Sequence, residues 1–404
     1  MSGYHFEGAR VILPDAVIEV SVTVEGHEIA AIDGPAGSAA RVDARGIVLA
    51  PALIDIHRDA FERQVMPRPG TFVPMDVAML ETDRQLAANG IATAYHALTL
   101  SWEPGLRSVE SGAAYVEALS GLAPRLTVEN RLQMRWEIFA FEALELIDRA
   151  LAGPLLPSIA FNDHTSMAMR AFDMPVTDRP FDLGEADIAP LSDGRMKQRT
   201  AGNARRAGMT NEAYVELLGQ VWERRGQVAA VVAEVAQKGS AKGVPMLSHD
   251  DSQPEMRRFY SELGAKVAEF PTCETTARDA RARGEWVVLG APNVMRGGSH
   301  IGSLHAADMI EDGVCDVLAS DYYYPAMLAA IGHLHRERRA GLAELWRLVA
   351  ANPAAASGLT DRGEIAPGKR ADLVLLDWPE GATPAVRMTL SNGTIAAMAG
   401  ELMR

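Results

Sequence analysis

Residues 49–64 read LAPALIDIHRDAFERQ, a short apolar run that leads directly into polar side chains. The strand expected over Leu53–Ile56 is followed by His57 and Asp59, which a single arginine separates. Alternate residues of a strand point to the same side, so this imidazole and this carboxylate share one face. A buried strand that ends in such a pair predicts a polar site at its carboxyl end.

Short β-rich runs recur through the middle of the chain, and helical patterns separate many of them. One such pattern is expected to begin after the N-cap Thr210 and to stop at Gly239. With the first strand there are eight runs: Leu53–His57, Ile91–Ala97, Leu132–Ile138, Leu156–Asn162, Val244–His249, Val267–Phe270, Val287–Ala291 and Val317–Asp321. This alternation favours a (β/α)8 barrel, with a doubly wound open sheet as the alternative.

The two ends of the chain share a different texture, in which short strand-like runs are separated by Gly, Asp and Asn. The segment SNG at residues 391–393, between apolar runs, is a hairpin signal. We therefore predict an α/β protein with a TIM-like barrel over residues 51–354. Residues 1–50 and 355–404 are expected to form one small β-sandwich module.

The composition restricts the class of protein. The 404 residues are 48% hydrophobic and 23% charged, as in ordinary globular proteins, and there is neither a long apolar run nor a signal-peptide pattern, so no membrane association is expected. The net charge of −14 argues against nucleic-acid binding. The two cysteines, Cys273 and Cys315, cannot build a disulfide framework, which favours the cytoplasm.

Most of the eight runs carry an imidazole or a carboxylate at the carboxyl end, where barrel enzymes place their chemistry. The residues are His57, Asp59, Glu137, His164, His249 and Asp321. Neutral imidazoles and carboxylates suit Zn²⁺, Mn²⁺, Fe²⁺ or Ni²⁺. No cysteine lies at these ends, which excludes a structural zinc site of the cysteine type.

Several motifs carry a resemblance to a known family. APALIDIH followed by x-Asp, and the late segment GEIAPGKRADLVLLD, resemble the amidohydrolase superfamily of metal hydrolases. Within it, the chain is most similar to the α-D-ribose 1-methylphosphonate 5-triphosphate diphosphatases of bacterial phosphonate metabolism. The motifs that carry this similarity are DIHRDAFERQVMPRPG, NDHT, LSHDD, EFPT, GAPNVMRGGSHIGS and ASDYYYP.

The resemblance implies roles for the residues at the strand ends. It implies one or two divalent ions, zinc foremost, held by His57, Asp59, His164 and His249. Glu137 would replace the carboxylated lysine that bridges two metals in many relatives; the alternative is a buried ion pair with Arg131 or Arg135. Asp321 would be the general base that takes a proton from the attacking water. The alternative for Asp321 is a loop cap.

A phosphorylated small molecule needs cationic groups and backbone N–H donors for its phosphates. The segment after the seventh run offers Arg296, Gly297, Gly298 and His300. Arg68, between two prolines, and Arg58 are expected to support them, with a solvated loop as the alternative for Arg68 and Arg296.

The expected reaction is hydrolysis of a phosphoanhydride in α-D-ribose 1-methylphosphonate 5-triphosphate, with release of diphosphate. A C–N hydrolase, either a deacetylase or a deaminase acting on another small molecule, is the alternative. Departures from the family pattern around Arg58 and after His164 keep that alternative open, and His96 is a further departure. A metal-binding scaffold without catalysis is a third hypothesis, and a homo-oligomer is left open.

Overall fold

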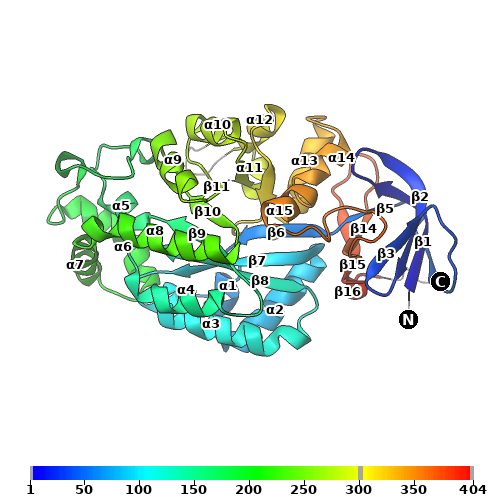
Figure 1. The fold of residues 1–404 in the computed structure, drawn as a ribbon, viewed down its shortest axis with the longest axis horizontal. Helices are drawn as coiled ribbons and strands as arrows, with labels where there is room; N and C mark the ends of the chain where they lie inside the picture. Colours follow the sequence, from blue (N-terminus) through cyan, green and yellow to red (C-terminus); the bar gives the residue numbers. More distant parts are fainter. Residues whose placement is uncertain (1–2, 299–303, 401–404) are drawn as a thin grey trace.

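A parallel barrel forms the larger part of the computed structural model, which describes residues 3–298 and 304–400 (Figure 1). Its eight strands follow the order β13-β12-β11-β10-β9-β8-β7-β6. They are β6 (Leu53–Arg58), β7 (Ile91–Leu100), β8 (Glu129–Glu137), β9 (Ser158–Asn162), β10 (Met246–His249), β11 (Val267–Glu269), β12 (Trp286–Gly290) and β13 (Val317–Ala319). Each of these strands overlaps one of the expected runs. The predicted barrel is therefore confirmed, and the alternative of a doubly wound open sheet is wrong.

Polar contacts bring the first and the last barrel strands together. The buried carboxylate of Asp55, on β6, accepts hydrogen bonds from the Ser320 amide at 3.1 Å and from the Ser320 hydroxyl at 2.6 Å. Next to it, the Asp321 amide donates to the His57 carbonyl and the Asp59 amide donates to the Asp321 carbonyl. Barrel closure therefore places His57, Asp59 and Asp321 side by side.

Helices cover the outside of the barrel. They are α1 (Glu62–Val65), α2 (Met75–Ala88), α3 (Val109–Leu122), α4 (Leu144–Leu151), α8 (Arg225–Lys242), α9 (Pro254–Glu262), α10 (Glu274–Ala282), α11 (Ala291–Arg296), α12 (Ala306–Glu311), α13 (Ala326–Arg336), α14 (Leu342–Arg347) and α15 (Ala351–Ala356). A longer excursion between β9 and α8 holds α5 (His164–Met169), α6 (Gly194–Arg206) and α7 (Asn211–Trp222). No helix within the described residues is long and apolar enough to span a bilayer.

Thr210 caps the predicted helical segment as expected, but that segment differs from the prediction elsewhere. The Thr210 hydroxyl accepts from the Ala213 amide at 3.2 Å. The pattern is then split into α7 and α8, and α8 does not stop at Gly239 but continues to Lys242. It ends at Gly243, whose φ of 64° supplies the left-handed conformation that a helix C-terminus favours.

A second sheet is built from both ends of the chain. Its order is β16-β15-β14-β5-β1-β2-β3, with β4 paired to β1. The strands are β1 (Gly3–Ile12), β2 (Val17–Glu25), β3 (Glu28–Ile32), β4 (Ala40–Asp43), β5 (Ile47–Pro51), β14 (Leu373–Asp377), β15 (Ala385–Ser391) and β16 (Thr394–Met398). They lie together at one end of the molecule, blue beside red in Figure 1, and confirm the predicted β module from both termini.

Candidate functional site

Side chains from several strand ends meet in one cavity at the carboxyl end of the barrel. His57 at the end of β6, His249 at the end of β10 and Asp321 after β13 all line it, together with Asp59. His57 and His249 are buried, and their ring centroids are 5.2 Å apart. The chain thus collects two imidazoles and two carboxylates from three distant regions of the sequence.

One group of potential metal donors consists of His57, His249 and Glu269. The Nδ1 atom of His57 lies 3.0 Å from Oε2 of Glu269, and one donor atom from each of the three residues lies within 4.8 Å of the others. Within the described residues, these two atoms and both ring nitrogens of His249 are buried without a hydrogen-bond partner. His57 and Glu269 are at ion-pair distance, and imidazole and carboxylate atoms this close are also arranged as ligands around a shared cation would be.

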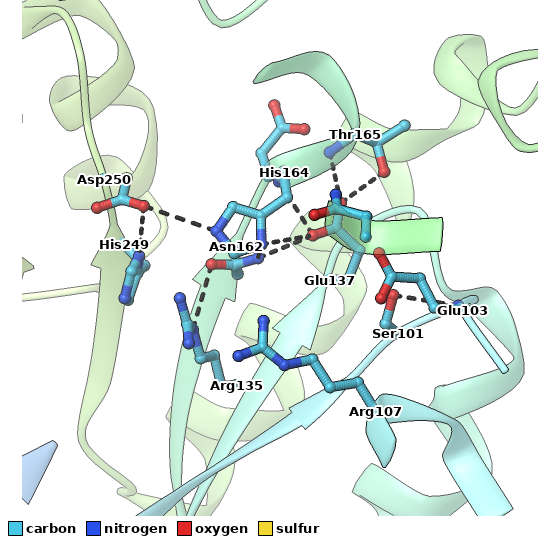
Figure 2. A network of polar contacts seen from close by, with 12 residues as sticks. Ser101, Glu103, Arg107, Arg135, Glu137, Asn162, His164, Thr165, His249 and Asp250 are labelled. Carbon is cyan, nitrogen blue, oxygen red and sulfur yellow. Dashed lines mark hydrogen bonds and ion pairs between the residues drawn. The ribbon is translucent and has the colours of Figure 1, made fainter. Parts of the chain in front are cut away.

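A second group consists of His164, His249 and Asp250, so it shares His249 with the first. Oδ2 of Asp250 lies 3.1 Å from Nδ1 of His249 and 3.7 Å from Nε2 of His164 (Figure 2). Asp250 has a φ of 57°, in a region that non-glycine residues seldom occupy. Two donor groups with a common imidazole could hold two adjacent ions.

Glu137 has a different environment from the one predicted. Its carboxylate accepts four hydrogen bonds, from the His164 and Thr165 amides, the Thr165 hydroxyl and the Asn162 amide group, at 2.7–3.0 Å. Figure 2 shows these contacts at the start of α5. Glu137 lies outside both donor groups, and its approach to Nδ1 of His164 is 3.9 Å. Its hydrogen bonds hold His164 in place, and its bridging role stays a prediction.

The charges around the cavity set the protonation of its residues. Burial and the Arg135 charge lower the pKa of His249 to about 4, which keeps that ring neutral and able to bind a metal. Burial and the Asp59 charge raise the pKa of Asp321 to about 7. Burial alone would raise the pKa of Asp59, but Arg135 and Arg107 outweigh it and lower that pKa. Two neighbouring carboxylates thus differ in basicity.

The predicted substrate-binding residues fall into different places. Arg296 and Gly298 line the cavity, and Gly297 ends α11 between them. His300 lies outside the described residues. Arg68 is exposed on the loop after α1 and is not among the residues that line this cavity.

Arg58 requires a correction. It is fully buried, and its guanidinium contacts His96, Asn130 and Tyr324 in the barrel wall rather than the cavity. The reason is strand alternation: His57 and Asp59 share one face of β6, and Arg58 points to the other. His96, the second departure noted in the sequence, lies in the same buried cluster.

Sequence reasoning missed Glu269 and Arg135 and gave Asp250 no role. Glu269 ends β11, so the rule that selected the other strand ends would also have selected it. Arg135 lies on β8 and lines the cavity, although the sequence suggested only an ion pair with Glu137. Its ion pair is with Asp59, at 3.6 Å, and Arg131 pairs with Glu129.

Comparisons with known proteins agree with this geometry. The sequence profile of the amidohydrolase family matches residues 74–397. A curated protein from Escherichia coli, the alpha-D-ribose 1-methylphosphonate 5-triphosphate diphosphatase, is 30% identical over 374 residues, which cover 91% of this chain and 93% of that protein.

Solved structures of similar fold include a hydantoinase and a dihydropyrimidinase. A D-hydantoinase from a Bacillus species has a TM-score of 0.60 at 13% identity, covering 97% of this chain and 94% of its own. A dihydropyrimidinase from Brevibacillus agri has a TM-score of 0.56 at 13% identity, with the same coverage of 97% and 94%. At this identity the likeness concerns the fold alone.

Proposed function

The chain belongs to the amidohydrolase family, and we propose that it is a metal-dependent diphosphatase acting on α-D-ribose 1-methylphosphonate 5-triphosphate. The activity in the name of the Escherichia coli relative supports this substrate, because that relative aligns with nearly the whole chain. The proposed reaction breaks a phosphoanhydride bond and releases inorganic diphosphate.

The observation that carries the proposal is the set of buried donor atoms without hydrogen-bond partners in the described structure. They belong to His57, His249 and Glu269, and a further group with His164 and Asp250 adjoins them. Nitrogen and carboxylate donors suit zinc first, and manganese, iron or nickel as alternatives. A divalent ion bound there would supply Lewis-acid activation of water and of a phosphoryl oxygen.

Asp321 is the proposed general base. It lines the same cavity as His57 and His249, and its pKa of about 7 suits a group that accepts a proton near neutral pH and then releases it. The neighbouring Asp59 lies outside both donor groups, and its pKa is lowered by Arg135 and Arg107 against the effect of burial. It therefore stays ionised, and its role as a further metal ligand is part of the proposal. The two carboxylates therefore have different tasks.

The triphosphate requires a local positive region in a chain of net charge −14. Arg296 and Gly298 line the cavity and are the proposed contacts for the diphosphate leaving group, with Gly297 beside them. A guanidinium can bind phosphate oxygens through two parallel hydrogen bonds.

The C–N hydrolase alternative loses part of its support in this structure. One of its two bases was the departure around Arg58, and that residue is buried with His96 in the barrel wall rather than in the cavity. The segment after His164 remains as its basis. We therefore keep C–N hydrolysis as an outcome of the test.

The test uses the purified chain loaded separately with zinc, manganese, iron or nickel. ³¹P NMR would follow diphosphate release from α-D-ribose 1-methylphosphonate 5-triphosphate, and parallel reactions would contain hydantoins, N-acetyl sugars and amino-heterocycles. We expect diphosphate from the triphosphate and no turnover of the neutral compounds. Hydrolysis of a neutral compound without any action on the triphosphate would reject the diphosphatase proposal.

We further propose a cytoplasmic location, which the two free thiols of Cys273 and Cys315 support. A homo-oligomer stays a prediction, to be measured by light scattering on the eluted protein.

A further inference from the structure

Arg135 occupies an unusual place in the candidate site. It lies on β8, two residues before Glu137, and lines the cavity together with His57, His249 and Asp59. Its side chain is only 7% exposed. A guanidinium stays charged at any ordinary pH, so a permanent positive charge is buried beside the donor groups.

Most of the hydrogen-bonding capacity of Arg135 is unused. A guanidinium has five N–H donors, and within the described residues Arg135 makes one hydrogen bond, from Nε to Oδ1 of Asn162 at 3.3 Å. Its Nη1 atom lies 3.6 Å from Oδ2 of Asp59, which is too long for a hydrogen bond. Figure 2 shows the guanidinium beside His249 with its single bond to Asn162. Because Arg135 lines the cavity, its remaining N–H donors are available to a ligand there.

Several buried or partly buried arginines of this chain donate directly to carboxylates, whereas the fully buried Arg58 contacts His96, Asn130 and Tyr324. Arg107 donates to both oxygens of Glu62 at 2.8 and 2.9 Å. Arg179 donates to Asp163 at 2.9 Å, and Arg257 donates to Glu285 at 2.8 Å. Arg135 differs from Arg107, Arg179 and Arg257 because its approach to a carboxylate, Asp59, is longer, at 3.6 Å, and leaves N–H donors available in the cavity.

The positive charge of Arg135 disfavours a cation at the donor groups, and nearby carboxylates such as Asp59, 3.6 Å from Arg135, oppose that effect. Its charge acts directly on both His57 and His249, the residues that would bind a metal. Two positive charges a few ångströms apart repel each other in a water-poor site. An anionic substrate group bound beside the guanidinium would reduce this repulsion further and would accept hydrogen bonds from its N–H donors.

We propose that Arg135 binds two oxygens of an anionic substrate group at the metal centre, as a substrate-binding residue distinct from Arg296. The proposal rests on the proposed function, in which a phosphoryl group supplies these oxygens. A neutral amide has no charge to offer there, so Arg135 would also select anionic substrates over neutral ones.

Two variants of the metal-loaded enzyme test the proposal: Arg135→Gln, which removes the charge, and Arg135→Lys, which keeps a charge but not the two-pronged geometry. The probe is inorganic diphosphate, with its affinity measured by calorimetry. We expect Arg135→Gln to weaken binding by about 10²-fold or more and Arg135→Lys by about 10-fold. Metal content should stay at the wild-type level in both.

Arg131→Lys is the matched control for Arg135→Lys. Arg131 lies on the same strand, but it pairs with Glu129 at 2.5 Å and does not line the cavity. Its replacement should leave diphosphate affinity unchanged. If Arg135→Gln does not fold, the Arg135→Lys chain decides the question by the same measurement.

Wild-type diphosphate affinity in a metal-loaded Arg135 variant would overturn the proposal while the diphosphatase function stands. Loss of metal from Arg135→Gln would assign the residue to the structure of the metal centre and would overturn it too. If the wild-type enzyme neither binds diphosphate nor hydrolyses the triphosphate, the proposed function falls first, and the role of Arg135 falls with it.

Discussion

Asp321, Asp250 and Phe270 each follow a barrel strand with a positive φ, at 55°, 57° and 55°. L-residues seldom adopt this conformation, and it is found where surrounding structure holds a residue for function. All three line the same cavity. At the scale of single residues, the chain therefore leaves β10, β11 and β13 through the same left-handed backbone conformation. In each case the residue that adopts it lines the cavity beside the donor groups.

The first prediction concerns Asp321. Asp321→Asn keeps the size and hydrogen bonding of the side chain but removes its basicity. We expect turnover to fall by about 10²–10⁴-fold, the usual contribution of a positioned base, with metal content unchanged. Steady-state kinetics and metal analysis on the same sample measure both. Wild-type turnover would reject the role, and loss of metal would make Asp321 a ligand instead.

The second prediction uses the imidazole that the two donor groups share. His249→Ala removes a ligand from both groups, whereas His164→Ala removes one only from the second. We expect His249→Ala to lose nearly all bound metal and His164→Ala to retain the ion at His57 and Glu269. Elemental analysis after dialysis measures the metal per chain, with His333→Ala on α13 as the control. Equal metal content in both variants would contradict the two-group arrangement.

Single residues also show how far the sequence predicted the site. The strand-end rule found His57, Asp59, His164, His249 and Asp321 because parallel strands point their carboxyl ends to one place. The alternation that pairs His57 with Asp59 already places Arg58 on the opposite face, so this misassignment was avoidable from the sequence. The available N–H donors of Arg135 could not be predicted, because they depend on which side chains the neighbouring strands place beside it.

Elements with strong local signals were predicted best. Asn392 and Gly393 connect β15 to β16 with φ values of 52° and 73°, as the SNG signal indicates. The predicted end of α8 was wrong because Gly239 lies within the helix and packs closely against β10. A Cβ at this position would come within 2.8 Å of the Met246 sulfur. A glycine required for close packing looks the same in sequence as a glycine that ends a helix.

The third prediction concerns the ion cluster at the start of β8. Glu129 pairs with Arg362 at 2.7 Å and also contacts Arg370, which joins the barrel to the segment before β14. Burial alone would raise the pKa of Glu129, but Arg362 and Arg131 outweigh it and lower the pKa from 4.5 to about 2. The resulting stability is present above about pH 4.5 and is lost as the pH falls toward 2.

Glu129→Gln should therefore lower the free energy of unfolding by about 2–3 kcal/mol at pH 7, with the difference from wild type shrinking below pH 4. Urea unfolding at a series of pH values measures this. The control is Glu145→Gln, at an exposed position on α4. A difference that stays constant from pH 7 to pH 3 would show that the effect is not ionic.

At the scale of the whole molecule, the two ends of the chain depend on each other. β14 pairs antiparallel with β5 over Leu373–Asp377, and β5 pairs with β1. The core of this sheet contains Phe6, Val11 and Leu49 from the N-terminal end and Leu373 and Leu375 from the C-terminal end. We propose that residues 1–50 and 355–404 form one folding unit, separate from residues 51–354.

The last prediction tests that unit. Leu375 is fully buried between strands from both ends, and Leu375→Ala should reduce local stability by about 2–5 kcal/mol, because a cavity remains where the side chain was. A composite module must then open as a whole. In hydrogen exchange, the amides of β1, β5 and β14 should lose protection together and by the same factor. Those of β10 and β11, which carry His249 and Glu269, should keep wild-type rates, and activity should persist.

Leu247→Ala, in the barrel interior, is the reciprocal control and should act on β10 and β11 instead. If β14 alone exchanged faster while β1 and β5 stayed protected, the two ends would be separate units and the composite module would be wrong.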